Sequence, residues 1–379
     1  MTSYIHQRQD WPNFRWDRQR LIEPLASVRH HQGRLIGRME GLGLRLREDA
    51  TLSSRTEEVL TSSEIEGETL DQHKVRSSVA RRLGIDIGAN TPTDRHIDGV
   101  VGMVLDATEN YAAPLTRTRL FGWHAALFPS GYSGRTKIIV GAWRDESSGQ
   151  MQVVSGDYGH ERVHFEAPAA SRLDIEMNGF LDWFNNPEET TDPVLKAGIA
   201  HLWFVTIHPF EDGNGRIGRA IADMALARSE KSAQRFYSMS SQIRKERRRY
   251  YDYLEDTQKG DLDITNHLEW FLDCLDRALD NAELELADIL RKARFWETNA
   301  GVSFNDRQRD MINRLFDGFI GKLTSSKWAK LSKSSQDTAL RDIDDLIRRG
   351  ILTKDAAGGR STSYSLVDLA TAPSAADYH

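Results

Sequence analysis

Hydrophobic residues recur at helical spacing over most of this chain. Between residues 17 and 48 they form one stripe, made of Leu21, Ile22, Leu25, Val28, Leu35, Ile36 and Met39. Steps of three and four residues place such a stripe on one face of a helix. The same spacing predicts helices at about 54–65, 72–83, 95–110, 116–127, 170–185, 192–207, 215–229, 241–258 and 263–296. The sequence therefore predicts a mainly α fold.

The pattern changes between residues 138 and 165. Short apolar runs such as "KIIVGAW" and "MQVVS" alternate here with the turn-forming stretches "RDESSGQ" and "GDYGHE". Apolar runs bounded by Gly, Asp and Ser are typical of short strands joined by turns. We therefore expect a small β-hairpin inserted between the helices.

The pattern changes again after "TNAG" at residues 298–301, and a compact unit follows at 304–367. It predicts a short helix, a Ser-rich turn, a helix at about 335–349, and a hairpin formed by "GILTKD" and "STSYSLV". This order resembles a winged helix-turn-helix. The resemblance places Ser334, Ser335, Gln336, Thr338 and Arg341 on a recognition helix and Arg360 in the wing. The predicted domains are a helical leader at 1–50, a core at 51–300, the winged-helix-like unit at 304–367, and a tail at 368–379.

Composition narrows the class of protein. A chain of 379 residues predicts two or three compact units. Its net charge of -6 argues against a whole-chain binder of nucleic acid or of a membrane surface. Cys274 is the only cysteine, which excludes an intrachain disulfide and a Cys-rich zinc site. No apolar run has the length of a signal peptide core or a membrane span. We expect a cytoplasmic protein without a membrane partner.

The stretch "HPFEDGNGRIGRA" at residues 208–220 concentrates the candidate chemistry. It joins two predicted helices by a Gly-rich loop, so the second helix presents unpaired N–H groups and a positive dipole end to an anion. Arg216 and Arg219 share one face of its first turn and suit phosphates. Asp212 is an oxygen ligand of the type that Mg²⁺ takes beside phosphates, and His208 could accept a proton. Each residue alone is most often structural, and their conjunction favours a site.

The first twelve of these residues, "HPFEDGNGRIGR", resemble the signature HPFx[DE]GNGRxxR of the Fic family at every fixed position. The resemblance implies an all-helical core that transfers AMP from ATP to a hydroxyl side chain of a target protein or of the enzyme itself. It implies His208 as the base, Asp212 as the ligand of Mg²⁺, and Arg219 as the holder of the γ-phosphate. The phosphate cradle that it implies consists of Gly213, Asn214, Gly215 and Arg216.

Two more distant stretches resemble parts of the same family. "TSSEIEGE" at residues 61–68 resembles its inhibitory motif [ST]xxxE[GN], on an inhibitory helix near 54–67, which implies that Glu66 pairs with Arg219 and displaces the γ-phosphate. The helix around residue 250 resembles the wall of the adenine pocket, which implies nucleotide contacts from Tyr250, Tyr251 and Gln258.

The hairpin of residues 138–165 occupies the position of the family's flap, which docks the target by adding a strand. The docking residues are then Val153, Val154, Ser155 and Gly156. A plain surface hairpin is the competing interpretation.

The expected partners are ATP and an unidentified target protein. DNA at the C-terminal unit and a second copy of the chain stay open as further partners. Two other functions also stay open. One is a transcription regulator whose core senses nucleotide. The other is a hydrolase, which either uses His201, His208 and Asp212 around a metal or removes AMP with the help of Glu66.

Overall fold

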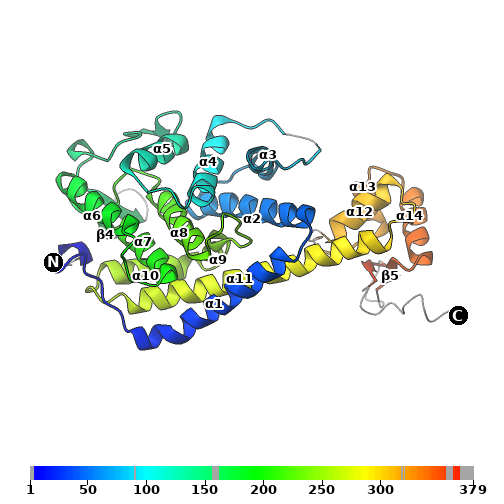
Figure 1. Ribbon diagram of the computed structural model, residues 1–379. Coiled ribbons are helices and arrows are strands. Elements are labelled where there is room, and N and C mark those ends of the chain that lie inside the picture. The colour runs from blue at the N-terminus through cyan, green and yellow to red at the C-terminus, as the bar shows by residue number, and fades with distance from the viewer. Residues whose placement is uncertain are drawn as a thin grey trace. The chain divides into compact units, whose positions relative to one another are not determined.

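The computed structural model describes residues 4–88, 91–155, 162–316, 319, 321–355 and 362–367 (Figure 1). Within them the helices are α1 (Arg18–Glu40), α2 (Leu44–Ile65), α3 (Gln72–Leu83), α4 (Arg95–Glu109), α5 (Arg117–Leu127), α6 (Leu173–Asn185), α7 (Pro193–Ile207), α8 (Asn214–Glu230), α9 (Met239–Lys245), α10 (Arg247–Gln258), α11 (Thr265–Thr298), α12 (Asp306–Phe316), α13 (Ser325–Leu331) and α14 (Gln336–Arg348). The strands are β1 (Tyr132–Ser133), β2 (Thr136–Lys137), β3 (Gln152–Ser155), β4 (Arg162–Glu166), β5 (Leu352–Lys354) and β6 (Tyr364–Leu366), paired as three antiparallel hairpins. Short 3-10 helices lie at Ile5–Gln7, Glu146–Ser148 and Ala170–Arg172. The mainly α prediction is confirmed.

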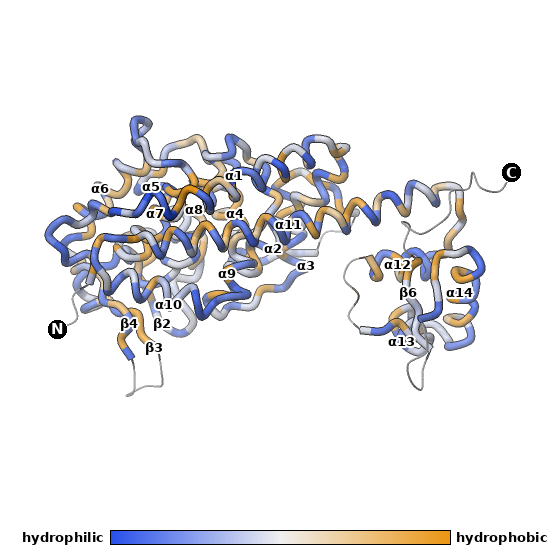
Figure 2. The backbone as a smooth tube through the Cα atoms, turned by 90° about the horizontal axis from the view of Figure 1, so that it is seen from below, coloured by the Kyte–Doolittle hydropathy of each residue, from blue (hydrophilic) through white to orange (hydrophobic). Residues whose placement is uncertain are grey.

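The chain divides into two compact units, Met1–Glu283 and Leu284–His379. The division falls inside α11, along which hydrophobic and hydrophilic segments alternate (Figure 2). No helix among the described residues has the length and apolar character that a membrane crossing needs.

The helices α7 and α8 form the centre of the first unit. Nearly every residue of α7 is buried, from Val194 to Ile207. The two helices approach closely because Gly218 has no side chain: a Cβ there would lie 2.8 Å from Cγ1 of Val205. This close packing holds the loop between α7 and α8 on a rigid support.

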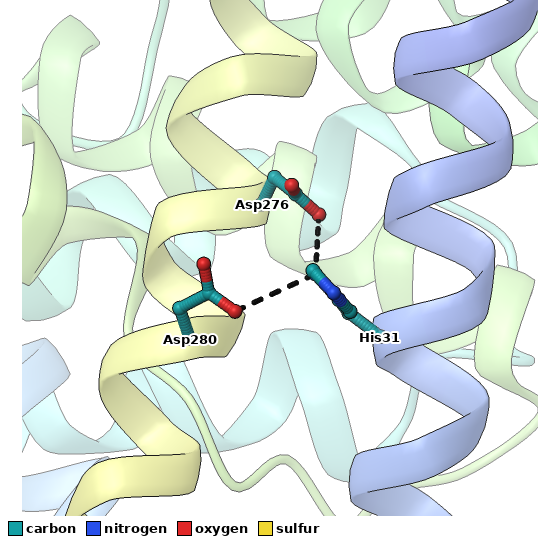
Figure 3. A group of neighbouring side chains, drawn as sticks. All are labelled: His31, Asp276 and Asp280. Atoms are coloured by element: carbon teal, nitrogen blue, oxygen red, sulfur yellow. Dashed lines mark hydrogen bonds and ion pairs between the residues drawn. The ribbon is translucent and has the colours of Figure 1, made fainter.

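Helices α1 and α11 lie side by side and run parallel (Figure 1). Three hydrogen bonds join residues 249 apart in sequence, at steps of seven: Arg20 to Glu269, Ser27 to Asp276, and Arg34 to Glu283. A seven-residue repeat is typical of two helices that pack along one seam. At the middle of the seam, His31 points between Asp276 and Asp280, with Nδ1 2.8 Å and 3.6 Å from their carboxylate oxygens (Figure 3).

Three local predictions were wrong. The helix expected over 17–48 is two helices, because Gly41 and Gly43 interrupt it between α1 and α2. The helix expected over 241–258 is also two, with the break at Glu246, whose φ of -119° and ψ of 32° are not helical. The run "KIIVGAW" contributes only Lys137 to a strand, and the N–H of Ile139 donates to the side chain of Glu211 at 2.6 Å instead of to a strand partner.

The second unit contains α13, α14 and the hairpin of β5 and β6 in the order expected from sequence, preceded by α12, which was not predicted. Leu352 pairs with Leu366 in the hairpin. Its core is formed by Phe295, Phe304, Met311, Ile312, Phe316, Leu323, Trp328, Ala339, Ile343, Leu346, Ile351, Leu352 and Tyr364. Arg360 and the tail at 368–379 lie outside the described residues.

Candidate active site

The loop from His208 to Gly213 is held by its own side chains and by the core beneath it. Asn214 accepts a hydrogen bond from the N–H of Phe210 at 3.0 Å and donates one to its carbonyl at 2.8 Å. The Phe210 ring is fully buried and stacks on His124, with ring centroids 4.1 Å apart. Gly213 has a φ of 80°, which favours glycine. The loop is therefore fixed before any ligand binds.

The half-buried His208 has a fixed orientation at the end of α7. Its ring atom Nδ1 lies 3.2 Å from the carbonyl oxygen of Val205, which can only accept, so Nδ1 carries the proton of the neutral ring. Burial lowers the pKa of His208 to about 4, so the ring is neutral at neutral pH. Nε2 has no hydrogen-bond partner within the described part of the chain and keeps its lone pair, the form that accepts a proton.

Asp212 carries the carboxylate of the loop. Its Oδ1 accepts a hydrogen bond from the Gly213 N–H at 2.6 Å, and its Oδ2 accepts one from the Ser133 hydroxyl. His124 Nδ1 accepts from the N–H of Gly141 at 3.1 Å, so its Nε2 donates to the Asp212 carbonyl at 3.2 Å. Asp212 is thus positioned through both its side chain and its backbone.

The N-terminus of α8 is a candidate anion site, which the carboxylate of Glu66 approaches closely in this structure. Its N-cap residue is Gly213, and no side chain among the described residues caps its first N–H groups. Unpaired N–H groups at a helix start bind anions. Gly215 makes room for the Glu66 carboxylate, because a Cβ there would lie 2.1 Å from Glu66 Oε1. The end of α2 fills the space that an anion would take.

Glu66 and Arg219 form the ion pair that the sequence resemblance implies. Oε1 of Glu66 lies 2.8 Å from a terminal nitrogen of Arg219. The Arg219 side chain is 4% exposed and that of Glu66 30%. Burial alone would lower the pKa of Arg219, but Glu66 raises it well above its ordinary value. The arginine is therefore a buried cation neutralised by this carboxylate.

A second ion pair, which sequence reasoning missed, lies beside the first. Oε2 of Glu68 is 2.7 Å from a terminal nitrogen of Arg216, and Oε1 of Glu68 bonds Nε2 of His96. Both arginines of the loop are thus neutralised by acids that follow the end of α2. The sequence signal was present, because Glu68 repeats the acid of "EGE" two residues after Glu66.

The expected adenine contacts lie in the interior. Tyr250 is 1% exposed, and its hydroxyl lies 3.1 Å from Nε2 of His201. Gln258 is 6% exposed and donates to the Thr206 hydroxyl at 3.2 Å. Tyr251 is half-buried, with its hydroxyl 3.5 Å from the Ile65 carbonyl oxygen at the end of α2. Tyr251 thus contacts the end of α2, and the contacts of all three residues with the nucleotide stay predictions.

The predicted flap is the hairpin of β3 and β4. Val153 pairs with Phe165 and packs on a small cluster with Tyr4, whereas Val154 is 49% exposed and Ser155 is also exposed. Gly156 lies outside the described residues.

The flap is tied to α10 through Glu255. This carboxylate bonds Arg162 of β4 at 2.8 Å and His164 of β4 at 2.5 Å. Burial alone would raise its pKa, but hydrogen bonds from Lys259, His164 and Arg162 lower it to about 2. Glu255 is therefore ionised over the whole physiological range.

His201 does not join a metal site with His208 and Asp212. It is 2% exposed and bonds Tyr250 inside the core. Among the described residues, the His, Cys, Asp and Glu side chains that gather with all ligand atoms within 4.8 Å are His31, Asp276 and Asp280 instead. The hydrolase alternative therefore has no three-residue metal centre in this loop.

Arg144 is a further site residue that sequence reasoning missed. It is 2% exposed and donates to the carbonyls of His208 at 2.8 Å and Pro168 at 2.6 Å. Its own N–H bonds the Pro209 carbonyl at 2.9 Å. Arg144 thereby fixes the turn that presents His208, and no pattern in the sequence around it indicates this.

Comparison with protein families matches residues 114–226 to the Fic/DOC family and residues 4–85 to a domain of unknown function, DUF4172. The protein adenylyltransferase Fic of Aedes aegypti is 29% identical over 220 residues, which are 57% of this chain and 39% of that protein. Its namesake in Nematostella vectensis is 33% identical over 114 residues, 30% of this chain and 25% of that protein. The chain spans well under half the length of these curated relatives.

Two solved structures resemble this fold. A Fic family protein from Desulfovibrio desulfuricans G20 has a TM-score of 0.50 at 23% identity, covering 92% of this chain and 96% of that one. A Fic domain-containing signalling protein from Bacteroides thetaiotaomicron VPI-5482 has a TM-score of 0.51 at 20% identity, covering 68% and 95%. Both likenesses concern the arrangement of the helices.

Proposed function

Because residues 114–226 match the Fic/DOC family, we propose that this chain transfers AMP from ATP to a hydroxyl group of a target protein or of the chain itself. The observation that carries the proposal is the neutral His208, with Nε2 free, at the start of a loop that leads to the uncapped N-terminus of α8. A proton acceptor beside a phosphate-type anion site suits the attack of a hydroxyl on a phosphate.

The transfer is a displacement at the α-phosphorus of ATP. The hydroxyl oxygen of the target bonds the α-phosphorus, and Nε2 of His208 takes the hydroxyl proton. The bond from the α-phosphorus to its bridging oxygen breaks, and pyrophosphate leaves with those electrons. The N–H groups of α8 and the guanidinium of Arg216 stabilise the charge on the phosphates. Arg219 holds the γ-phosphate once Glu66 has left it.

Asp212 fits the role of a Mg²⁺ ligand. Each of its carboxylate oxygens accepts one hydrogen bond, from Gly213 or Ser133, and retains a further lone pair. Carboxylate oxygens are the ligands that Mg²⁺ takes when it also holds phosphates. When bound, the ion neutralises charge on the phosphates.

Glu66 keeps the enzyme inactive in this proposal. Its carboxylate occupies the Arg219 guanidinium, so the γ-phosphate must displace it before ATP can bind productively. The exposed Val154 and Ser155 of β3 would receive the modifiable segment of the target as an added strand.

Labelled ATP tests the proposal. The E66G protein is incubated with a lysate and with ATP labelled at the α- or the γ-phosphorus, and H208A/E66G serves as the matched control. We expect the α-label on protein, no γ-label, and loss of the α-label in the control while ATP binding persists. Equal labelling with and without His208 would reject His208 as the base. ATP binding without any transfer would favour a transcription regulator whose core senses nucleotide. If the wild type released AMP from labelled protein and E66G did not, the hydrolase that removes AMP would be favoured.

A second function, DNA binding, concerns residues 304–367. Arg341, Arg348 and Lys354 line one hollow of this unit together with a single acid, Asp344. Asp342 instead turns inward to bond Arg307 at 2.8 Å. This leaves the face more basic than the sequence suggests, as phosphate contacts require. We propose a winged helix with weak DNA affinity, tested by fluorescence anisotropy with a labelled duplex at several salt concentrations. The R341A/R348A variant should bind more weakly and with a smaller dependence on salt, and equal binding would exclude this face.

A further inference from the structure

We infer that Glu68 is a second inhibitory carboxylate, which occupies a phosphate position on Arg216 as Glu66 does on Arg219, and that His96 holds it there. The inference rests on the proposed function, because it takes Arg216 and Arg219 to bind successive phosphates of one nucleotide. It adds a second contact that the substrate must displace, at a different phosphate.

The two carboxylates are arranged as a pair. Glu66 and Glu68 leave the end of α2 two residues apart and contact the first turns of α8 at 2.8 Å and 2.7 Å, respectively. Arg216 and Arg219 lie three residues apart on that helix, so they share one face. The spacing of the acids thus matches the spacing of two cations that suit phosphates.

Arg216 has capacity for an anion larger than the one it holds. Its side chain is 6% exposed and packs over the Phe128 ring, with the guanidinium carbon 5.2 Å from the ring centroid. Within the described residues its Nε is buried without a hydrogen-bond partner. A buried donor left unpaired is costly. A phosphate, with three oxygens, can accept from Nε and from a terminal nitrogen together, as Glu68 does not.

His96 fixes Glu68 from the opposite side. Its Nδ1 lies 3.0 Å from the Leu127 carbonyl oxygen, and its Nε2 bonds the Glu68 carboxylate. Both ring nitrogens therefore face acceptors, an arrangement that the doubly protonated ring satisfies. Glu68 raises the pKa of His96, in agreement with that form. The charge of Arg216 opposes this shift and lowers the pKa of His96. His96 is a positioning residue, since it acts on the site through Glu68.

Glu68 is itself ionised between the two cations. Burial alone would raise its pKa, but the bond from His96 and the charge of Arg216 lower it, against the opposing charge of Asp212. The two contacts then differ in the ligands they exclude. Glu66 blocks a nucleotide that reaches Arg219, which requires a γ-phosphate, whereas Glu68 blocks any nucleotide that reaches Arg216, which includes ADP.

Calorimetry with Mg·ADP and Mg·ATP tests this difference on the full chain. E68Q should lower the Kd of both nucleotides about tenfold, because it removes the charge that competes for Arg216; tenfold corresponds to about 1.4 kcal/mol. E66Q should lower the Kd of ATP by a similar factor, and it should change the Kd of ADP by less than about twofold. The matched control is E64Q, since Glu64 lies on the same turn but bonds Arg244 of α9, and it should keep both wild-type values.

The positioning role of His96 has its own readout. H96A should give part of the E68Q gain in ADP affinity, and H96Q, whose amide can donate to Glu68, should stay closer to wild type. H96A/E68Q should bind as E68Q does, because the two changes act through one contact. Additive effects, or equal affinities in H96A and H96Q, would overturn this role. If E68Q has a lowered melting temperature, E68D replaces it, because aspartate keeps the charge on a shorter side chain. E68D should also bind ADP more tightly than the wild type does.

The outcomes separate the inference from the proposed function. An unchanged ADP affinity in E68Q and E68D, with tighter ATP binding in E66Q, would overturn the role of Glu68 and leave the proposed function intact. Failure of E66Q to alter ATP binding or transfer would contradict the proposed function, while ADP binding by E68Q would still decide whether Glu68 blocks Arg216. A gain in E64Q equal to that in E68Q would assign the effect to net charge and would also overturn the inference.

Discussion

Ser62 holds the guanidinium of Arg219 on the edges that Glu66 leaves free. Nε of Arg219 donates to the Ser62 hydroxyl at 3.0 Å, and a terminal nitrogen donates to the Ser62 carbonyl at 2.7 Å. The arginine is therefore positioned by the backbone and side chain of Ser62 as well as by Glu66. Loss of Glu66 leaves these two hydrogen bonds in place.

E66G should accordingly raise self-modification, by about tenfold or more, which corresponds to about 1.4 kcal/mol of activation free energy. The γ-phosphate then meets an arginine that is free and already oriented. E66G/R219A should lose the gain, and E66G/S62A should keep part of it, because one of the two remaining hydrogen bonds is gone. The α-label incorporated per minute measures all of these proteins. A lower rate in E66G would instead favour a role for Glu66 in removing AMP.

D212A should lose the strengthening of ATP binding by Mg²⁺, because the carboxylate that would hold the ion is absent. S133A removes only the hydrogen bond to Oδ2 and should retain most of the effect. Calorimetry with and without Mg²⁺ measures both variants. Equal strengthening in D212A and wild type would assign the ion to another residue.

The free energy of unfolding should fall as the pH is lowered from about 6.5 to 4. Burial lowers the pKa values of the fully buried His124 and His267 to about 4, whereas in the unfolded chain they are ordinary. Between these values the unfolded chain binds protons that the native state does not, so acid favours unfolding. Each histidine contributes up to about 3 kcal/mol. Urea unfolding at pH 7, 5.5 and 4.5 measures the slope, which His267→Gln should reduce; a flat profile would contradict the neutral buried rings.

The C-terminal unit should be more stable on its own when it includes the end of α11. Phe295 is 4% exposed within its core, and Trp296 packs against that core. A chain of residues 284–379 should show a single sharp thermal transition. A chain of residues 302–379 lacks both aromatic side chains and should be less stable by about 3 kcal/mol or more, as for loss of a large buried side chain. Equal melting temperatures would show that α11 adds nothing to this core.

Local sequence patterns predict much of this fold, because helix formation depends on the spacing of nearby apolar residues and on the residue that caps each helix. Most helix bounds follow the spacing of apolar residues, and Asp17, Asp71, Asp94, Thr116 and Asp192 cap the helices that they precede. At Gly41 and Glu246 a helix is interrupted for only a few residues while the apolar spacing continues. The spacing alone therefore does not predict these two breaks.

The candidate site is predictable only where its residues adjoin in sequence. The stretch from His208 to Arg219 contains most of the candidate chemical groups. The residues that position these groups are distant in sequence. Arg144 and Ser133 reach the loop through tertiary contacts, and His96 reaches Arg216 only through Glu68. Similarly, the core of the C-terminal unit includes Trp328, which an amphipathic pattern over a seven-residue helix does not reveal.

Gly215 limits how inhibition can be lost by mutation. A Cβ at this position would collide with the Glu66 carboxylate, and it would equally intrude on a phosphate that replaced the carboxylate. A genetic selection for permanently active variants should therefore recover changes at Glu66 and none at Gly215. The Glu66 carboxylate and the phosphate would occupy the same space beside Gly215. A substitution of Glu66 can therefore relieve inhibition, whereas a larger residue at position 215 would exclude the phosphate together with the carboxylate.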